Sequence, residues 1–288
     1  MSIPKYEAFL KAVEYGSFTR AGQLLGYTQS GVSHMIRDLE SEWGVSLLER
    51  DRSGVRITSD GLKLMPFIQR VCEAQRALAG EVDELHELKS GLIRIGTFSS
   101  VATHWLPNMI KTFRAEYPNI EFELLLGDYA EIEGWIVQGR VDCGFVTLPA
   151  RADLDAIFLE EDALLAIMPE GHPLAEMPRF PLKGLEAEPF LLMEKGGKNE
   201  ISEIFERHHL HPDVKFVTWD DYAIMSMVEN GLGIAILPAL VLKRAPYRIA
   251  KRELEVPAFR KIGVALRDAG AAPLAVKRFL EYLKFRSQ

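Results

Sequence analysis

The stretch from Ser17 to Glu40, SFTRAGQLLGYTQSGVSHMIRDLE, constrains the fold of this chain more than any other. Apolar residues recur at three- and four-residue steps on both sides of a Gly-Tyr-Thr turn, which predicts two short amphipathic helices packed crosswise. Ser17 and Thr28 each precede one of these helices and can accept hydrogen bonds from its first backbone N–H groups. The apolar residues are Phe18, Ala21, Leu24 and Leu25 in the first helix and Val32, Ile36 and Leu39 in the second.

If the apolar residues of the second helix are buried, its polar residues face outward. They carry amide, hydroxyl, imidazole and guanidinium groups, which hydrogen-bond base edges or phosphates when such a helix lies in the major groove of DNA. An ordinary helical hairpin with a solvated polar face is the alternative that this segment leaves open. The outward residues are Gln29, Ser30, Ser33, His34 and Arg37.

The flanking segments extend this unit. A further helix is predicted to begin at Pro4 and to end at Gly16. After Glu40, short apolar runs surround a glycine-containing turn at 51–54, which predicts a β-hairpin wing beside the two helices. Arg52 and Arg56 would then be placed to contact the phosphate backbone, with a solvated turn as the alternative.

The net charge of -7 does not decide between these alternatives. Residues 1–58 are close to electrically neutral, and no long segment is basic overall. A protein that binds a DNA groove needs only a local positive face. The helix pattern, rather than the charge, therefore carries the DNA-binding hypothesis. Such a face could be formed by Arg20, Arg37, Arg50, Arg52, Arg56 and Lys63.

Composition restricts the remaining classes. With 288 residues, 48% of them hydrophobic and 26% charged, the chain is predicted to be a soluble protein of two or three domains. Its apolar runs are shorter than the ~18 residues that span a bilayer, and its first residues are charged, so a cytoplasmic protein without membrane contact is expected. Cys72 and Cys143 stand alone and far apart, so we expect no disulfide, no metal site and no cofactor. We find no catalytic arrangement of residues and expect a protein that is not an enzyme.

The region 59–90 predicts a long helix with a heptad seam. Seven residues follow one another at steps of 4, 3, 4, 3, 4 and 3. A helix of this length reaches roughly 45 Å, and its seam predicts a dimer. A long helix that lies on the next domain is the alternative. The seam consists of Leu64, Ile68, Val71, Gln75, Leu78, Val82 and Leu85.

From Gly91 onward, predicted strands alternate with predicted helices, which is typical of a parallel α/β arrangement. The pattern divides into two sets, so we expect two lobes with a cleft between them at the carboxyl ends of strands. The first lobe is expected at about 91–161 and 266–288, and the second at about 162–265. Predicted strands include 92–97, 120–126, 143–146, 163–168, 190–193, 215–217, 234–237 and 260–266, and predicted helices include 103–117, 132–140, 200–209, 222–231 and 274–285.

With these parts in this order, the chain resembles the LysR-type transcriptional regulators over essentially its whole length. The segments that carry the resemblance are GSFTRAGQLLGYTQSGVSHMIRDLE, WGVSLLER, RITSDG, GLIRIGTFSS and VENGLGIAILP. The chain departs from the family where paired alanines are usual (Ala21 and Gly22), at Gly31 and at Leu48. The resemblance implies an α+β multidomain fold: a winged helix-turn-helix domain (1–58), a linker and dimerisation helix (59–90), and a two-lobed, periplasmic-binding-protein-like effector domain (91–288).

The resemblance also implies a function. The chain would be a homodimer or homotetramer that binds an imperfectly palindromic site in double-stranded promoter DNA, and a small molecule in the cleft would change the angle between its DNA-binding heads. RNA polymerase is a candidate partner. By position, Gln29, Ser30 and Ser33 match base-reading residues. Residues suited to phosphates are Thr28, Arg37, Arg52 and Arg56.

In the effector domain, candidate residues lie where strands end. Ser99 and Ser100 follow the first strand and precede a helix, so their hydroxyl and backbone N–H groups could hold an anion or a carboxylate. A plain helix cap is the alternative for either serine. The effector-binding candidates are Ser99, Ser100, Val101, Thr103, Thr147, Met193, Thr218 and Trp219.

Two other classes remain as alternatives. The two-lobed unit alone is similar to a solute-binding protein, although the first 90 residues and the charged N-terminus argue against that class. An enzyme that uses the cleft is the second alternative.

Overall fold

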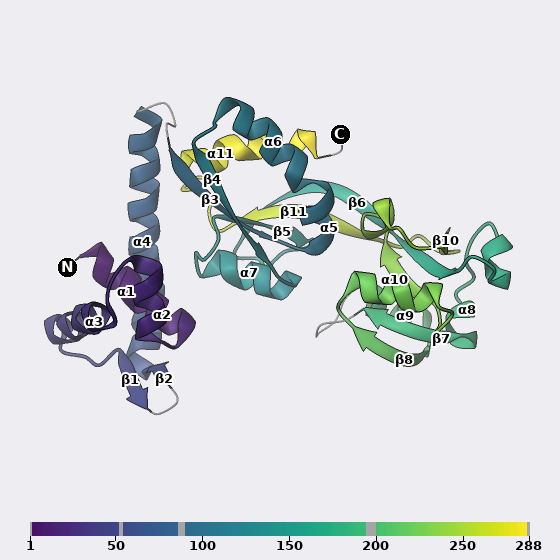
Figure 1. Cartoon of the computed structure of the whole chain (residues 1–288), viewed down its shortest axis with the longest axis horizontal. Helices are drawn as coiled ribbons and strands as arrows, with labels where there is room; N and C mark the ends of the chain where they lie inside the picture. The colour runs from purple at the N-terminus through teal and green to yellow at the C-terminus, as the bar shows by residue number, and fades with distance from the viewer. Residues whose placement is uncertain (1, 52–53, 86–89, 194–199, 287–288) are drawn as a thin grey trace.

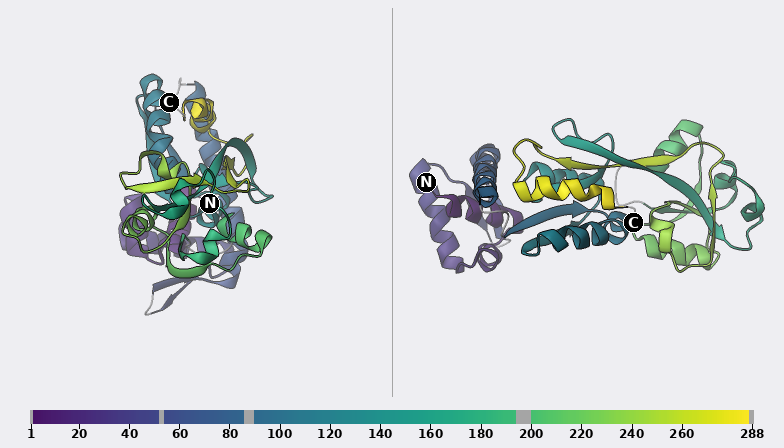
Figure 2. Two further views of the ribbon diagram at one scale, coloured as in Figure 1. Left: turned by 90° about the vertical axis from the view of Figure 1, so that its right-hand side faces the viewer. Right: turned by 90° about the horizontal axis from the view of Figure 1, so that it is seen from above.

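The computed structural model describes residues 2–51, 54–85, 90–193 and 200–286. Three parts follow one another along the longest axis: an N-terminal head, lobe I and lobe II (Figures 1 and 2). The long helix α4 (Ser59–Leu85) stands between the head and lobe I. None of the described helices combines the length and the apolar character needed to cross a membrane.

The head contains the predicted helix-turn-helix. Its helices are α1 (Ile3–Tyr15), α2 (Phe18–Leu25) and α3 (Gln29–Trp43). Both predicted caps are confirmed, because Ser17 Oγ accepts from the N–H of Arg20 at 3.3 Å and Thr28 Oγ1 accepts from the N–H of Gly31 at 3.1 Å. Glycine at position 22 permits the tight turn, since a Cβ there would lie 2.6 Å from the Tyr27 carbonyl oxygen.

The predicted wing is also confirmed. Strands β1 (Leu48–Asp51) and β2 (Gly54–Ile57) pair antiparallel. The predicted phosphate contact Arg52 lies outside the described residues. The wing is tied to the helices, because the N–H of Val55 donates to the carbonyl of Gly16 at 3.0 Å and Glu40 Oε1 accepts from the N–H of Leu47 at 2.7 Å.

Lobe I is built on β3 (Gly91–Thr97), β4 (Ile120–Leu126) and β5 (Cys143–Thr147), which are parallel. The single helix predicted at 103–117 is wrong, because the chain forms α5 (Ser99–His104) and α6 (Leu106–Glu116). Pro107 lies in the first turn of α6, where a missing N–H is tolerated. Helix α7 (Tyr129–Val137) follows β4, and α11 (Leu274–Leu280) closes the chain with the short helix η3 (Glu281–Phe285).

Two long strands join the lobes. β6 (Asp155–Pro169) and β11 (Phe259–Leu266) pair antiparallel and extend from lobe I toward lobe II (Figure 1). The parallel arrangement predicted from the sequence is confirmed for β3, β4 and β5, but the sheet as a whole is mixed, since β9 (Ala235–Pro238) and β10 (Ile249–Glu253) also pair antiparallel with β6. The first half of β6 escaped prediction because its residues are mostly exposed or charged and show no apolar alternation.

Lobe II adds a parallel pair, β7 (Pro189–Met193) and β8 (Asp213–Thr218), with α9 (Glu200–His208) and α10 (Asp221–Glu229). Its buried clusters are separate from the cluster of lobe I. Each lobe therefore has its own core, and β6 and β11 form the connection between the lobes. The remaining short helices are η1 (Pro173–Glu176), α8 (Gly184–Ala187) and η2 (Val241–Arg244).

Candidate DNA-binding face and effector cleft

The outer side of α3 carries four of the predicted DNA-binding residues. Gln29, Ser30, His34 and Arg37 are exposed, while Val32, Ile36 and Leu39 are buried in the core of the head. Side chains that hydrogen-bond bases or phosphates thus lie on the open surface of a helix that follows a capped turn, as docking into a DNA groove requires.

Ser33 does not share this surface. Its exposed fraction is only 5%, so the expectation that its side chain projects outward is wrong. The cause is helix geometry: a residue is rotated by about 100° from its neighbour, which places Ser33 beside buried Val32 and Ile36 rather than opposite them. The centre of the open side is instead occupied by Ser30, His34 and Arg37.

The polar groups of α3 are already oriented by neighbours. Thr28 Oγ1 lies 3.0 Å from Ser30 Oγ, and Arg37 Nε donates to the Ser33 carbonyl at 3.3 Å. His34 Nδ1 lies 3.2 Å from Asp38, and the hydrogen bond from Lys5 lowers the pKa of Asp38. In the wing, Arg56 is exposed on β2.

Helix α4 exposes Val71, Leu78 and Val82 of the predicted seam but buries the start of that seam. Ile68 is 3% exposed and Leu64 packs against the same cluster, so both belong to the core of their own head and Ile68 cannot contact a partner helix. Two other apolar residues of α4 lie outside this core: Phe67 is 62% exposed and Leu78 is 59% exposed. We name the exposed residues Phe67, Val71, Leu78 and Val82 the α4 stripe. The side chain of Leu85 lies outside the described residues.

A buried arginine organises the region between the lobes. Arg260, at the start of β11, is 3% exposed and binds Asp162 of β6 through Nε at 2.9 Å and Nη2 at 2.7 Å. It also donates to the Tyr129 hydroxyl and to Ser100 Oγ, both at 2.8 Å, and its guanidinium lies 5.0 Å from the centre of the Phe98 ring. One cation thus joins β6, β11, the start of α5 and the start of α7.

A second contact joins the two lobes directly. Ser99 Oγ donates a hydrogen bond to Oδ2 of Asp221, the first residue of α10 in lobe II. Burial raises the pKa of Asp221, although the Ser99 hydrogen bond and Arg260 act in the opposite direction. Burial likewise raises the pKa of Glu200, which begins α9 and feels the charges of Arg260 and Asp162. Both predicted serines therefore have internal partners.

The other predicted effector residues fall into distinct positions. The side chain of Val101 is fully buried in the core of lobe I, so it cannot contact an effector. Thr103 is exposed and donates to the carbonyl of Ser99 at 2.8 Å. Thr147 ends β5 opposite Ile262 of β11. Met193, Thr218 and Trp219 lie together at the ends of β7 and β8 in lobe II.

Sequence reasoning missed Arg260, Asp162, Tyr129 and Asp221. One signal was present for Arg260. It shares the period-two alternation of Ile262 and Val264 along the predicted strand, and both of those residues are buried. An arginine on the inner side of a strand requires a carboxylate partner, which would have directed attention to the strand that pairs with it.

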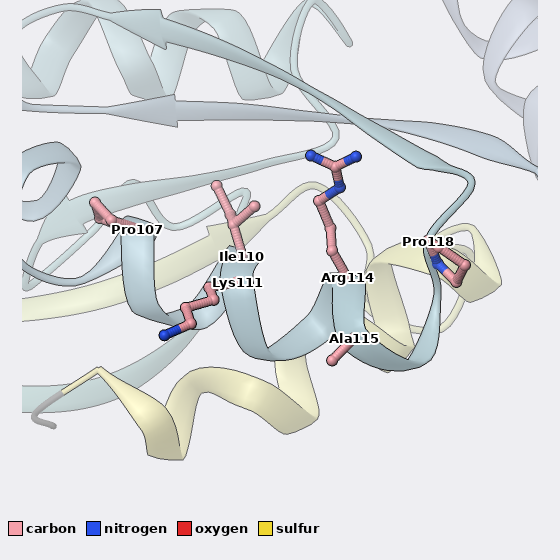
Figure 3. A pocket seen from close by; sticks show the side chains of 6 residues that line it. All are labelled: Pro107, Ile110, Lys111, Arg114, Ala115 and Pro118. Atoms are coloured by element: carbon pink, nitrogen blue, oxygen red, sulfur yellow. The ribbon is translucent and has the colours of Figure 1, made fainter.

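A shallow groove on α6 is a separate surface feature (Figure 3). It is lined by Pro107, Ile110, Lys111, Arg114, Ala115 and Pro118, and the close-up shows these side chains on α6 and the turn after it. None of them belongs to the Arg260 cluster. Among the described residues, no group of three or more histidine, cysteine or acidic side chains is arranged to hold a metal ion.

Comparison with known proteins identifies both halves of the chain. The model of the LysR substrate binding domain matches residues 86–287, and the model of the bacterial regulatory helix-turn-helix protein, lysR family, matches residues 3–62. The HTH-type transcriptional regulator YvbU of Bacillus subtilis is 32% identical over 99% of this chain and 98% of its own. The probable HTH-type transcriptional regulator LrrA of Synechococcus elongatus is 31% identical over 99% of this chain and 97% of its own.

Solved structures agree on the fold. A full-length OxyR variant from Pseudomonas aeruginosa superposes with a TM-score of 0.78 at 20% identity, covering 99% of this chain and 95% of that chain. Full-length CbnR in complex with its target DNA gives a TM-score of 0.66 at 21% identity and covers 100% of both chains. At these identities the likeness supports the arrangement of head, long helix and two lobes.

Proposed function

The chain belongs to the LysR family of DNA-binding transcriptional regulators, and we propose that it reads promoter DNA with the open side of α3 and senses a small molecule in the cleft organised by Arg260. The observation that supports the DNA-binding part best is the exposure of Gln29, Ser30, His34 and Arg37 on a helix with a capped start. Arg56 on the wing is suited to contact a phosphate beside this surface.

Binding is expected to require two heads. The head is close to electrically neutral, so a single copy gains little from the attraction of DNA phosphates. The α4 stripe offers an exposed apolar surface that a second α4 can cover, and a pair of heads would match two half-sites. We propose a homodimer as the basic unit, which acts in the cytoplasm on promoter DNA and contacts RNA polymerase there.

The cleft is proposed to bind its effector without converting it. The relatives that match over the whole chain are named as transcriptional regulators. The Arg260 cluster ties both crossing strands to α5 and α7, so an effector that inserts among these groups changes how the lobes are held. Because Ser99 already binds the Asp221 carboxylate, an effector carboxylate would replace Asp221 at this hydroxyl.

Promoter binding tests the proposed DNA-reading surface. A band-shift titration uses the promoter region beside the protein's own coding sequence and compares the wild-type chain with a Gln29→Ala, Arg37→Ala double variant. The lost base contact of Gln29 should cost about 1 to 3 kcal/mol, and the lost charged hydrogen bond of Arg37 to a phosphate should cost about 1.5 to 3 kcal/mol. Lys215→Ala is the matched control, because it removes a positive charge from β8 in lobe II. Wild-type affinity in the double variant would exclude this reading surface.

A further inference from the structure

Helix α7 and the turn that follows it connect the Arg260 cluster to the DNA-binding head. Its first residue, Tyr129, accepts a hydrogen bond from Arg260 at 2.8 Å and places its ring 5.1 Å from the ring of Phe98. The start of the helix is fixed by a reciprocal cap, in which Asp128 accepts from the N–H of Glu131 at 2.8 Å and Glu131 accepts from the N–H of Asp128 at 2.9 Å. The start of α7 is therefore held in place by Arg260 of β11, by Phe98 and by its own cap.

The middle of α7 lies directly on the sheet of lobe I. Ile132 and Ile136 are fully buried beneath it. They pack against strand backbone, because a Cβ at Gly144 would lie 2.6 Å from Ile132 and 2.9 Å from Ile136. With nine residues the helix is about 13 Å long. A helix seated this closely moves as one body, because its two ends cannot shift independently without breaking these contacts.

The turn that follows α7 contacts the head and the linker helix. Arg140 Nε lies 3.0 Å from Glu14 of α1, and the guanidinium lies 5.1 Å from the Trp135 ring centre. Arg76 of α4 donates to the carbonyl of Gly139 at 3.1 Å and lies 3.4 Å from Asp142. We name these contacts the α7–head interface.

A neighbouring ion pair strengthens the same interface. Arg267, just after β11, pairs with Glu73 of α4. The Glu73 carboxylate is partly buried, and this burial raises its pKa even though Arg267 and Arg76 oppose the effect. The named contacts across the interface are ion pairs and hydrogen bonds, and polar interfaces of this kind between domains can separate and re-form.

The α7–head interface leaves the α4 stripe exposed. Helical rotation separates Glu73 and Arg76 from Val71 and Leu78 by roughly 140° to 160° around α4. One side of α4 therefore binds lobe I while the opposite side stays open to a second copy. Pairing of α4 helices and the α7–head interface are compatible with each other.

We propose that α7 is the mechanical link that transmits the state of the cleft to the DNA-binding head. This inference rests on the proposed function of the cleft as an effector site. A change at Arg260 and Tyr129 displaces the start of α7, and the rigid helix carries the displacement to Gly139 and Arg140. The orientation of α1 and α4 relative to lobe I then changes, and with it the direction in which the head presents α3.

Hydrogen–deuterium exchange of the full-length protein without DNA tests this link. Tyr129→Phe removes the hydroxyl that accepts from Arg260 and leaves the Arg260–Asp162 pair in place. We expect peptides that cover 138–142 and 70–76 to exchange about three- to tenfold faster, which corresponds to one lost hydrogen bond. Arg140→Gln acts at the other end, and by reciprocity we expect faster exchange around 98–100 as well.

Tyr117→Phe is the matched control, because this tyrosine packs on Phe113 in lobe I and is not part of α7. The link is overturned if Tyr129→Phe changes exchange only around 98–100 and 129–131, or if the control gives the same pattern. These readouts need neither DNA nor effector. A failed promoter titration together with the expected exchange pattern would therefore reject the proposed function and leave the mechanical link supported.

Discussion

The hydroxyl of Ser99 donates a 2.5 Å hydrogen bond to the carboxylate of Asp221, and this contact joins the first helix of lobe I to α10 of lobe II. Asp221 is nearly buried, and its burial raises its pKa. The protein thus carries its own carboxylate at the hydroxyl where an effector carboxylate was expected.

Asp221→Asn should make the stability of the effector domain less dependent on pH. A carboxyl group whose pKa is raised on folding binds its proton more tightly in the folded state, so the folded state loses stability as pH rises above 3.8, the ordinary value. The loss is complete once pH exceeds the folded pKa. Asparagine keeps a hydrogen-bond acceptor and does not ionise. We expect the Tm difference between variant and wild type to grow from pH 3.5 to pH 7, whereas Asp213→Asn on exposed β8 should show no such growth.

Ser33→Ala and Arg37→Ala should separate the buried side of α3 from its open side. Ser33 is buried, so its truncation should change promoter affinity by no more than about twofold, the usual effect of a change away from a contact. Arg37 is exposed, and its loss should cost about 1 to 3 kcal/mol. Band-shift titrations measure both. A larger loss for Ser33→Ala than for Arg37→Ala, with an unchanged Tm, would contradict this orientation of α3.

Leu78→Lys should weaken dimerisation without unfolding the head. Leu78 belongs to the α4 stripe, and a charge there would have to be buried when two stripes meet. Sedimentation should therefore show a shift toward monomer with little change in Tm. Ile68→Ala should instead lower the Tm with little shift toward monomer. It removes a side chain from the core of the head, at a cost of about 2 to 5 kcal/mol. An unchanged mass for Leu78→Lys would exclude the stripe as the dimer contact.

Alanine should change the stability of the protein in opposite directions at two glycines, one inside α7 and one in the turn after it. Gly139 has φ +64°, and a Cβ there would lie 2.7 Å from Glu73 of α4, so Gly139→Ala should lower stability by about 1 kcal/mol or more and loosen the α7–head interface. Gly134 lies inside α7 with open space around it, so Gly134→Ala should raise stability by about 1 kcal/mol. Thermal unfolding measures both effects, and destabilisation by both substitutions would contradict the described packing.

The two cysteines should not act as peroxide sensors. Both are buried, and burial raises the pKa of Cys72 to about 11 and also raises the pKa of Cys143. Reactive thiols need a substantial thiolate fraction and access to solvent. We expect the native protein to react with a thiol reagent only after denaturation, and hydrogen peroxide to leave promoter binding unchanged. Rapid labelling of either cysteine under native conditions would refute this expectation.

The head was predictable because its signals are local. The caps at Ser17 and Thr28, the turn between them and the hairpin at 48–57 depend on residues only a few positions apart, and all of them form as expected. Ser33 was expected on the open side of α3 because its side chain is polar. Its burial is decided instead by its position around the helix.

The long helix shows how a correct periodicity can still misplace a contact. The heptad pattern predicted α4, but Ile68 packs into its own head while Phe67 is exposed. Lying on the next domain was the alternative to dimerisation, and α4 does contact lobe I through Glu73 and Arg76. A helix that contacts more than one neighbour has several apolar or charged sides, and periodicity alone does not say which neighbour contacts which side.

The sequence by itself determined the order of the parts, the helix-turn-helix, the wing and the long helix, because caps, turns and periodicity act within a few residues. Only the tertiary structure decided which groups meet between the lobes and at the head. Arg260 and Asp162 are 98 positions apart, Ser99 and Asp221 are 122 apart, and Arg267 and Glu73 are 194 apart. Such pairs form only when separate elements pack, so no local pattern of residues could have specified them.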